Sequence, residues 1–125
     1  MSEEIVWETS FRNAVALAKK TNKLVLASFL APCCEACNRL KRSTLTAGCV
    51  QEYVHEHFIA IKYESGVDSD QFMRFDVTAK PAMIVLDAEG DEIFRKIGYF
   101  EPEVLVSKLE MAVKKAAHRA ARCHV

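Results

Sequence analysis

The stretch LVLASFLAPCCEAC, residues 24–37, determines the fold expected of this chain. Its first seven residues are apolar or small and partly β-branched, which is typical of a short strand buried on both faces. Pro32 then interrupts strand pairing, and three cysteines follow at the expected start of a helix. The segment therefore predicts a central strand, residues 24–30, that ends in a cysteine-bearing turn.

Helical and strand patterns alternate on both sides of this segment. The expected helices are residues 10–21, one from the cysteines towards Leu45, a short one between Gly48 and Phe58, one carrying Phe72 and Phe75, and a long one from Pro102. The expected strands are residues 24–30, 59–63, 83–86 and 93–97, the last two joined by a hairpin-type connection at 87–91. This order predicts an α/β fold with a central mixed β-sheet flanked by helices on both faces.

Three local contacts are also expected. Thr9 or Ser10 caps the first helix, and Trp7 packs beneath its start. Asp68 and Gln71 have the spacing of a capping box at the start of the fourth helix.

The composition describes one globular domain. The chain has 125 residues, 50% of them hydrophobic, and its 17 basic and 17 acidic residues give a formal charge of zero. This length buries roughly two thirds of the unfolded surface, enough for a core over about residues 7–117, followed by a basic tail at 118–125. Balanced charge argues against nucleic acid or an anionic membrane as partner. We expect a cytoplasmic location, because no apolar run approaches the ~18 residues of a membrane span. We also expect a monomer.

The cysteines indicate the chemistry. An odd count of five cannot form a closed disulfide framework, and a tight cluster in a domain with its own core indicates redox chemistry or metal binding in a reducing compartment. Cys34 and Cys37 form a C-x-x-C at the start of a helix, where unpaired N–H groups and the helix dipole stabilise a thiolate. Cys34 would attack a disulfide, and Cys37 would then displace the mixed disulfide.

With these features the chain resembles the thioredoxin superfamily from about Trp7 to Ala117, and more closely its thiol-disulfide interchange domains. The resemblance also rests on the Lys80, Pro81, Ala82 segment that opens a strand and on Gly98 before the last helix. It implies a cis Pro81 against the cysteine pair, next to backbone that pairs with an extended substrate. The implied function is a disulfide reductase with catalytic Cys34 and Cys37, substrate-binding Lys80, Pro81 and Cys33, protein thiol or disulfide substrates, an electron donor and no cofactor.

The chain departs from the thioredoxin pattern at the turn. Cys33 replaces the usual tryptophan, and Glu35 and Ala36 replace glycine and proline. The buried acid that assists the resolving cysteine would fall at Ser28, which cannot act as a base at neutral pH. Lys80 is expected near Cys34, where its charge would favour the thiolate.

Two other functions stay open. A metal-carrier domain would use Cys33, Cys34 and Cys37, with ligands added from His55, His57, His118, Cys123 or His124, although only one tight ligand cluster exists. A redox-inactive interaction module would need neither cysteine of the pair.

Several polar side chains have ordinary interpretations. Cys33 either fills the tryptophan position or acts as a third thiol. Cys49 is expected in the core, Cys123 in an exposed tail, and the histidines at the surface. Arg39, Lys41 and Arg42 form a solvated helix face or steer an acidic partner.

Overall fold

The computed structural model describes the backbone of residues 4–123 and the side chains of residues 4–120. Its elements are β1 (Trp7–Glu8), α1 (Phe11–Thr21), β2 (Leu24–Leu30), α2 (Glu35–Arg39), the π-helix η1 (Leu40–Thr44), α3 (Gly48–His57), β3 (Phe58–Glu64), α4 (Ser69–Arg74), β4 (Ala82–Leu86), β5 (Glu92–Ile97) and α5 (Pro102–Cys123). The predicted α/β class is confirmed. No helix in the described part of the chain is both long and apolar enough to cross a membrane.

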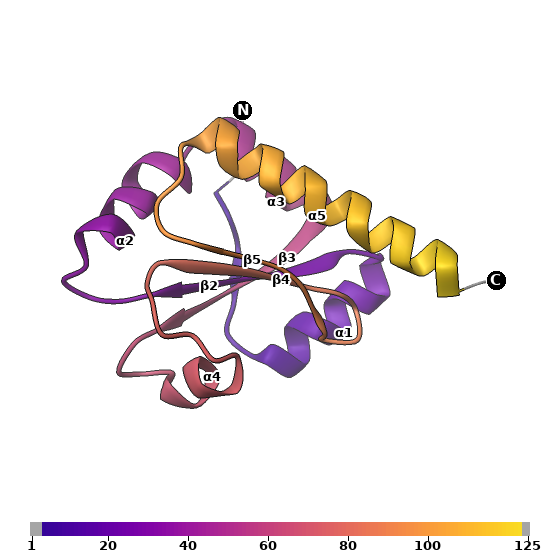
Figure 1. Cartoon of the computed structure of the whole chain (residues 1–125), viewed down its shortest axis with the longest axis horizontal. Helices are drawn as coiled ribbons and strands as arrows, with labels where there is room; N and C mark the ends of the chain where they lie inside the picture. Colours follow the sequence, from indigo (N-terminus) through magenta and orange to yellow (C-terminus); the bar gives the residue numbers. More distant parts are fainter. Residues whose placement is uncertain (1–3, 124–125) are drawn as a thin grey trace.

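The strands form one mixed sheet in the order β1-β3-β2-β4-β5. The β2 strand pairs in parallel with β3 and antiparallel with β4, so it lies at the centre of the sheet. Helices cover both faces, with α3 and α5 on one side and α1 and α4 on the other (Figure 1). The buried run at residues 24–30 is therefore enclosed as predicted.

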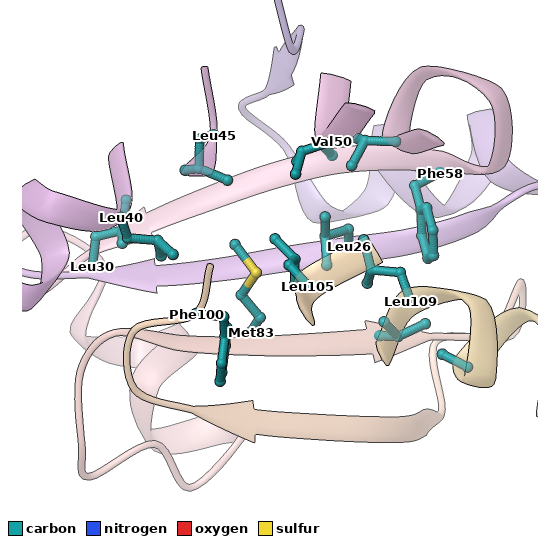
Figure 2. Close-up of a cluster of buried hydrophobic side chains, with 14 of the residues drawn as sticks. Leu26, Leu30, Leu40, Leu45, Val50, Phe58, Met83, Phe100, Leu105 and Leu109 are labelled. Carbon is teal, nitrogen blue, oxygen red and sulfur yellow. The ribbon is translucent and has the colours of Figure 1, made fainter. Parts of the chain in front are cut away.

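Alternate residues of β2 supply the two halves of the core. Leu26 and Leu30 pack in the cluster under α2, α3 and α5, where Figure 2 shows Leu105 and Leu109 of α5 close to Leu26. Val25, Ala27 and Phe29 pack against the other half, which α1 and α4 cover. Because side chains alternate along a strand, one seven-residue segment contacts both helical layers.

Local signals place the ends of α1. The Ser10 hydroxyl oxygen accepts a 3.3 Å hydrogen bond from the Asn13 N–H, so Ser10 rather than Thr9 is the cap. The helix ends at Asn22 in a left-handed conformation with φ of 57°. Lys23 follows as a short connection into β2.

Three expectations are wrong. The Asp68 carboxylate accepts a 2.7 Å hydrogen bond from the Glu64 N–H, so it ties down the preceding loop and forms no capping box with Gln71. Trp7 lies in β1 and packs against the core half under α2, α3 and α5, whereas Phe11 at the start of α1 packs against the other half. The helix α5 continues to Cys123, so residues 118–123 extend the helix and do not begin a separate tail.

Candidate dithiol site

The cysteine turn connects the end of β2 to the start of α2. Cys34 is the N-cap residue of α2, with an extended backbone at φ −108° and ψ 114°. Its Sγ accepts a 3.2 Å hydrogen bond from the Cys37 N–H. The helix N-terminus therefore directs a backbone donor at the Cys34 sulfur, an arrangement that favours negative charge on that atom.

The three clustered thiols differ in burial. Cys33 is exposed and Cys34 is half-buried, whereas Cys37 has no exposed surface. Burial and then the hydrogen bond with Cys34 raise the pKa of Cys37 to about 11, while an Ala31 backbone hydrogen bond and the Lys41 charge act in the opposite direction. An incoming sulfur atom can thus reach Cys34, and Cys37 is held behind it as a neutral thiol.

Pro81 lies at the same end of the sheet as the cysteine turn. It directly precedes β4, whose first residue Ala82 pairs with Phe29 near the end of β2. The Lys80–Pro81 peptide bond is cis, and the Pro81 carbonyl accepts a 2.8 Å hydrogen bond from the Gly98 N–H. Two loops that the sequence separates therefore meet beside the turn.

Lysine charge acts on the site from an unexpected position. The Lys80 Nζ lies 5.9 Å from the centre of the Phe72 ring. This ring belongs to the half of the core that α1 and α4 cover. The lysine whose charge lowers the pKa of Cys37 is Lys41, on η1. Its position four residues after Cys37 was the sequence signal for this charge effect, because residues at that spacing share a helix face.

Two further cations border the turn. The Arg39 guanidinium lies 4.3 Å from the centre of the Tyr99 ring, which links α2 to the loop before α5. Arg42 and Glu35 form an exposed ion pair at 3.8 Å. The Glu35 charge beside the turn is thus paired with a neighbouring cation.

Ser28 is buried on the same face of β2 as Leu26 and Leu30, the face that packs against Cys37. Its hydroxyl oxygen has no hydrogen-bond partner among the described residues. The buried side chain on this face of β2, at the position where the resemblance predicts an acid, is therefore a neutral hydroxyl.

The remaining candidates lie apart from the dithiol. Cys49 is exposed near the start of α3, so its expected place in the core is wrong; Val50 and Val54 supply the buried face of this helix instead. The His57 ring packs 4.4 Å from the Tyr53 ring, and His55 is exposed. Within the described residues, no group of three or more His, Cys, Asp or Glu side chains is placed to hold a metal ion. The Cys123 side chain and His124 lie outside the described part.

Comparison with known proteins identifies the family. The family model described as "Thioredoxin-like domain" matches residues 11–112. The chain therefore belongs to the thioredoxin-like domain family, and its fold and its Cys34-x-x-Cys37 pair agree with that assignment. No curated protein sequence matches the chain.

Solved structures show the same fold. A thioredoxin from Thermus thermophilus is 18% identical with a TM-score of 0.80, and the match covers 91% of each chain. The structure titled "DsbH Oxidoreductase" is 20% identical with a TM-score of 0.75, over 90% of this chain and 87% of that one. A putative disulphide-isomerase from Bacteroides thetaiotaomicron is 22% identical with a TM-score of 0.74, and the match covers 90% of this chain and 96% of that one.

Proposed function

We propose that this protein is a thiol-disulfide oxidoreductase that reduces disulfides in protein substrates in the cytoplasm. The observation that carries the proposal is the contrast between two thiols. Cys34 is half-buried and its Sγ accepts a hydrogen bond from the Cys37 N–H, whereas Cys37 is buried and has a raised pKa. Family membership and the similarity in fold to DsbH oxidoreductase support the same chemistry. A reducing compartment would keep the pair ready as a dithiol.

The proposed reaction transfers two electrons from the dithiol. The Cys34 thiolate attacks one sulfur of a substrate disulfide, a mixed disulfide forms, and the first substrate sulfur leaves as a thiolate. Cys37 then gives its proton to water and attacks the Cys34 sulfur, which closes the Cys34–Cys37 disulfide and releases the second substrate sulfur as a thiolate, which takes up a proton from water. A dithiol donor restores the reduced pair. In this scheme Pro81, Lys80 and Cys33 border the surface that the substrate approaches.

A redox titration tests the proposal. Metal-free protein is equilibrated in graded glutathione buffers, and the trapped thiols are mapped by mass spectrometry. We expect one reversible two-electron transition confined to Cys34 and Cys37, with a midpoint closer to the roughly −270 mV of thioredoxin than to the roughly −120 mV of DsbA. A more oxidising midpoint would contradict the reductase direction, and capture of either sulfur by Cys33 would contradict the assigned pair.

Two variants assign the roles. Cys34→Ser is expected to abolish disulfide reduction, while Cys37→Ser should accumulate a mixed disulfide with the substrate at Cys34. Cys49→Ser is the matched control, because Cys49 is an exposed free thiol on another helix. Loss of activity in the control, or trapping at Cys33, would contradict the scheme.

A further inference from the structure

The Arg95 guanidinium joins β5 to the end of α4. It donates hydrogen bonds to the carbonyl oxygens of Phe75 and Asp76, the latter at 3.1 Å. It also donates two hydrogen bonds to the Glu92 carboxylate, at 2.9 Å from Nε and 2.7 Å from Nη2. Arginine carries its donors in a rigid planar fork, so one side chain bonds a carboxylate and two carbonyls together.

A β-bulge places Glu92 beside Arg95. The residue of β4 that follows Val85 pairs with Glu92 instead of Ile93, so Ile93 is an extra residue in β5. In a regular strand side chains alternate between the two faces, and positions three apart lie on opposite faces. The extra residue shifts this alternation by one, which brings the Glu92 carboxylate to the face where Arg95 meets α4.

The end of α4 leaves two carbonyl groups for the guanidinium. Asp76 has a left-handed backbone with φ of 53°, and its N–H and the Val77 N–H donate to carbonyls in the last turn of α4. These are the two bonds of a Schellman ending. The Phe75 and Asp76 carbonyls accept neither of them, and Arg95 bonds both. A cation is also favoured here because the carbonyl end of a helix carries partial negative charge.

Residues 75–81 connect this helix end to Pro81, and β5 holds both ends of the segment. Arg95 bonds the carbonyls at its start, and the Gly98 N–H donates a 2.8 Å hydrogen bond to the Pro81 carbonyl at its end. In Figure 1 the segment runs from α4 to the start of β4, at the end of the sheet where β2 leads into the cysteine turn. The place of Pro81 beside the dithiol therefore depends on two positions of the chain at and just after β5.

We propose that Arg95 is a positioning residue, which fixes the start of segment 75–81 and so holds the backbone beside Pro81 where the peptide chain of a disulfide substrate binds. That a substrate binds there rests on the proposed function. Within the described part of the chain, the hydrogen bonds of Arg95 go to Glu92 and the two α4 carbonyls and not to the dithiol. Arg95 should therefore affect the binding of peptide substrates and leave the chemistry of the sulfur atoms unchanged.

Hydrogen exchange, followed by NMR, tests the positioning without any substrate. Arg95→Met keeps an unbranched apolar side chain but removes every donor, so the Asp76 and Val77 amides should exchange about tenfold faster, while amides of β2 stay within about twofold of their natural rates. Arg12→Met, at an exposed position of α1, is the matched control and should change neither set. Unchanged exchange at Asp76 and Val77, or equal acceleration in β2, would overturn the inference.

Two disulfides separate substrate binding from chemistry. One joins two octapeptides, and the other is bis(2-hydroxyethyl) disulfide, which has no peptide backbone; dithiothreitol is the electron donor for both. In Arg95→Met the KM for the peptide disulfide should rise about tenfold at nearly constant kcat, whereas the rate with the small disulfide should stay within about twofold. An unchanged KM, or an equal loss with both disulfides, would count against Arg95 as a positioning residue.

Arg95→Lys supplies the test if the methionine variant does not fold. One ammonium group cannot bond Glu92 and both carbonyls in the geometry of the fork, so exchange and KM should change in the same directions. The same outcomes overturn the inference in this variant. A failure of the proposed function is distinguishable, because it would appear as absent disulfide reduction by the natural chain, and the exchange measurement needs no turnover.

Discussion

The Thr44 hydroxyl donates a 2.5 Å hydrogen bond to the Phe100 carbonyl, and this bond joins the end of η1 to the loop before α5. Both groups are buried, and Thr44 is fully enclosed although it is polar. The wider π-helical turn brings Thr44 to this position after the cysteine helix. The bond therefore anchors the segment that follows Cys37 to the loop between β5 and α5.

Replacing this donor tests its contribution. Thr44→Val keeps the shape but leaves the Phe100 carbonyl without its buried partner, so the free energy of unfolding should fall by about 1–3 kcal/mol. Thr44→Ser keeps the hydroxyl and should lose less. Urea unfolding of both variants measures the difference, and a larger loss in Thr44→Ser than in Thr44→Val would show that packing of the methyl group outweighs the hydrogen bond.

Pro81→Ala tests the surface beside the dithiol. Under the proposed function, substrate turnover should fall at least several-fold, because Pro81 shapes the loop that meets Gly98 beside the turn. Steady-state reduction of a protein disulfide measures the effect, and the folded state is checked by circular dichroism. Pro102→Ala at the start of α5 is the control. Unchanged turnover in a folded Pro81→Ala protein would remove Pro81 from the site.

Ser28 determines whether Cys37 has a base nearby. Ser28→Asp places a carboxylate in the buried position on the Cys37 face, so the mixed disulfide at Cys34 should resolve about tenfold faster near neutral pH. Ser28→Ala should resolve at the natural rate, because a hydroxyl is not a base there. Acid quenching followed by mass spectrometry gives the lifetime of the mixed disulfide across pH 6–9. Slower resolution in Ser28→Ala would show that the hydroxyl takes part.

Tyr63 makes the stability sensitive to alkali. Its ring is buried, its hydroxyl has no partner among the described residues, and burial raises the pKa of Tyr63 from 10.0 to about 12. The unfolded chain ionises this phenol first, so stability is intact below pH 10 and is lost as pH rises from 10 to 12. The loss from this group is on the order of 2–3 kcal/mol.

The variant Tyr63→Phe removes that ionisation. It should unfold at the same urea concentration as the natural chain, or a slightly higher one, at pH 8, and should lose less stability between pH 10 and 11.5. Cys37, whose pKa is also raised, is present in both proteins and cancels in the comparison. Parallel alkaline losses in the two proteins would contradict the assignment to Tyr63.

The fold was largely predictable because its elements are specified locally. The run at residues 24–30 predicts the strand β2 with its observed bounds, and Ser10 supplies the cap of α1. The hairpin at 87–91 also forms as expected, with the Asp87 carboxylate accepting the N–H groups of Glu89 and Asp91. Apolar periodicity, caps and turn residues act over a few neighbouring positions, so a single sequence displays them.

The candidate site was predictable only in part. Cys34 and Cys37 share one turn, and their relation follows from a spacing of three at a helix start. By contrast, Asp68 bonds the Glu64 N–H and Cys49 faces solvent, although the local patterns favoured a capping box and a core position. Asp68 bonds a backbone N–H four residues earlier in the chain, and Val50 and Val54 rather than Cys49 face the core, so in both places more than one local arrangement was compatible with the pattern.

By itself, the sequence determined the buried strand, the helix that follows it and the dithiol between them. The tertiary structure alone decided that Lys41 and Lys62 line one hollow together with Trp7. These residues come from η1, β3 and β1, and they meet because β1 and β2 both pair in parallel with β3. Parallel neighbours are joined by crossovers through helices, so this proximity depends on the order of strands in the sheet and leaves no local pattern in the chain.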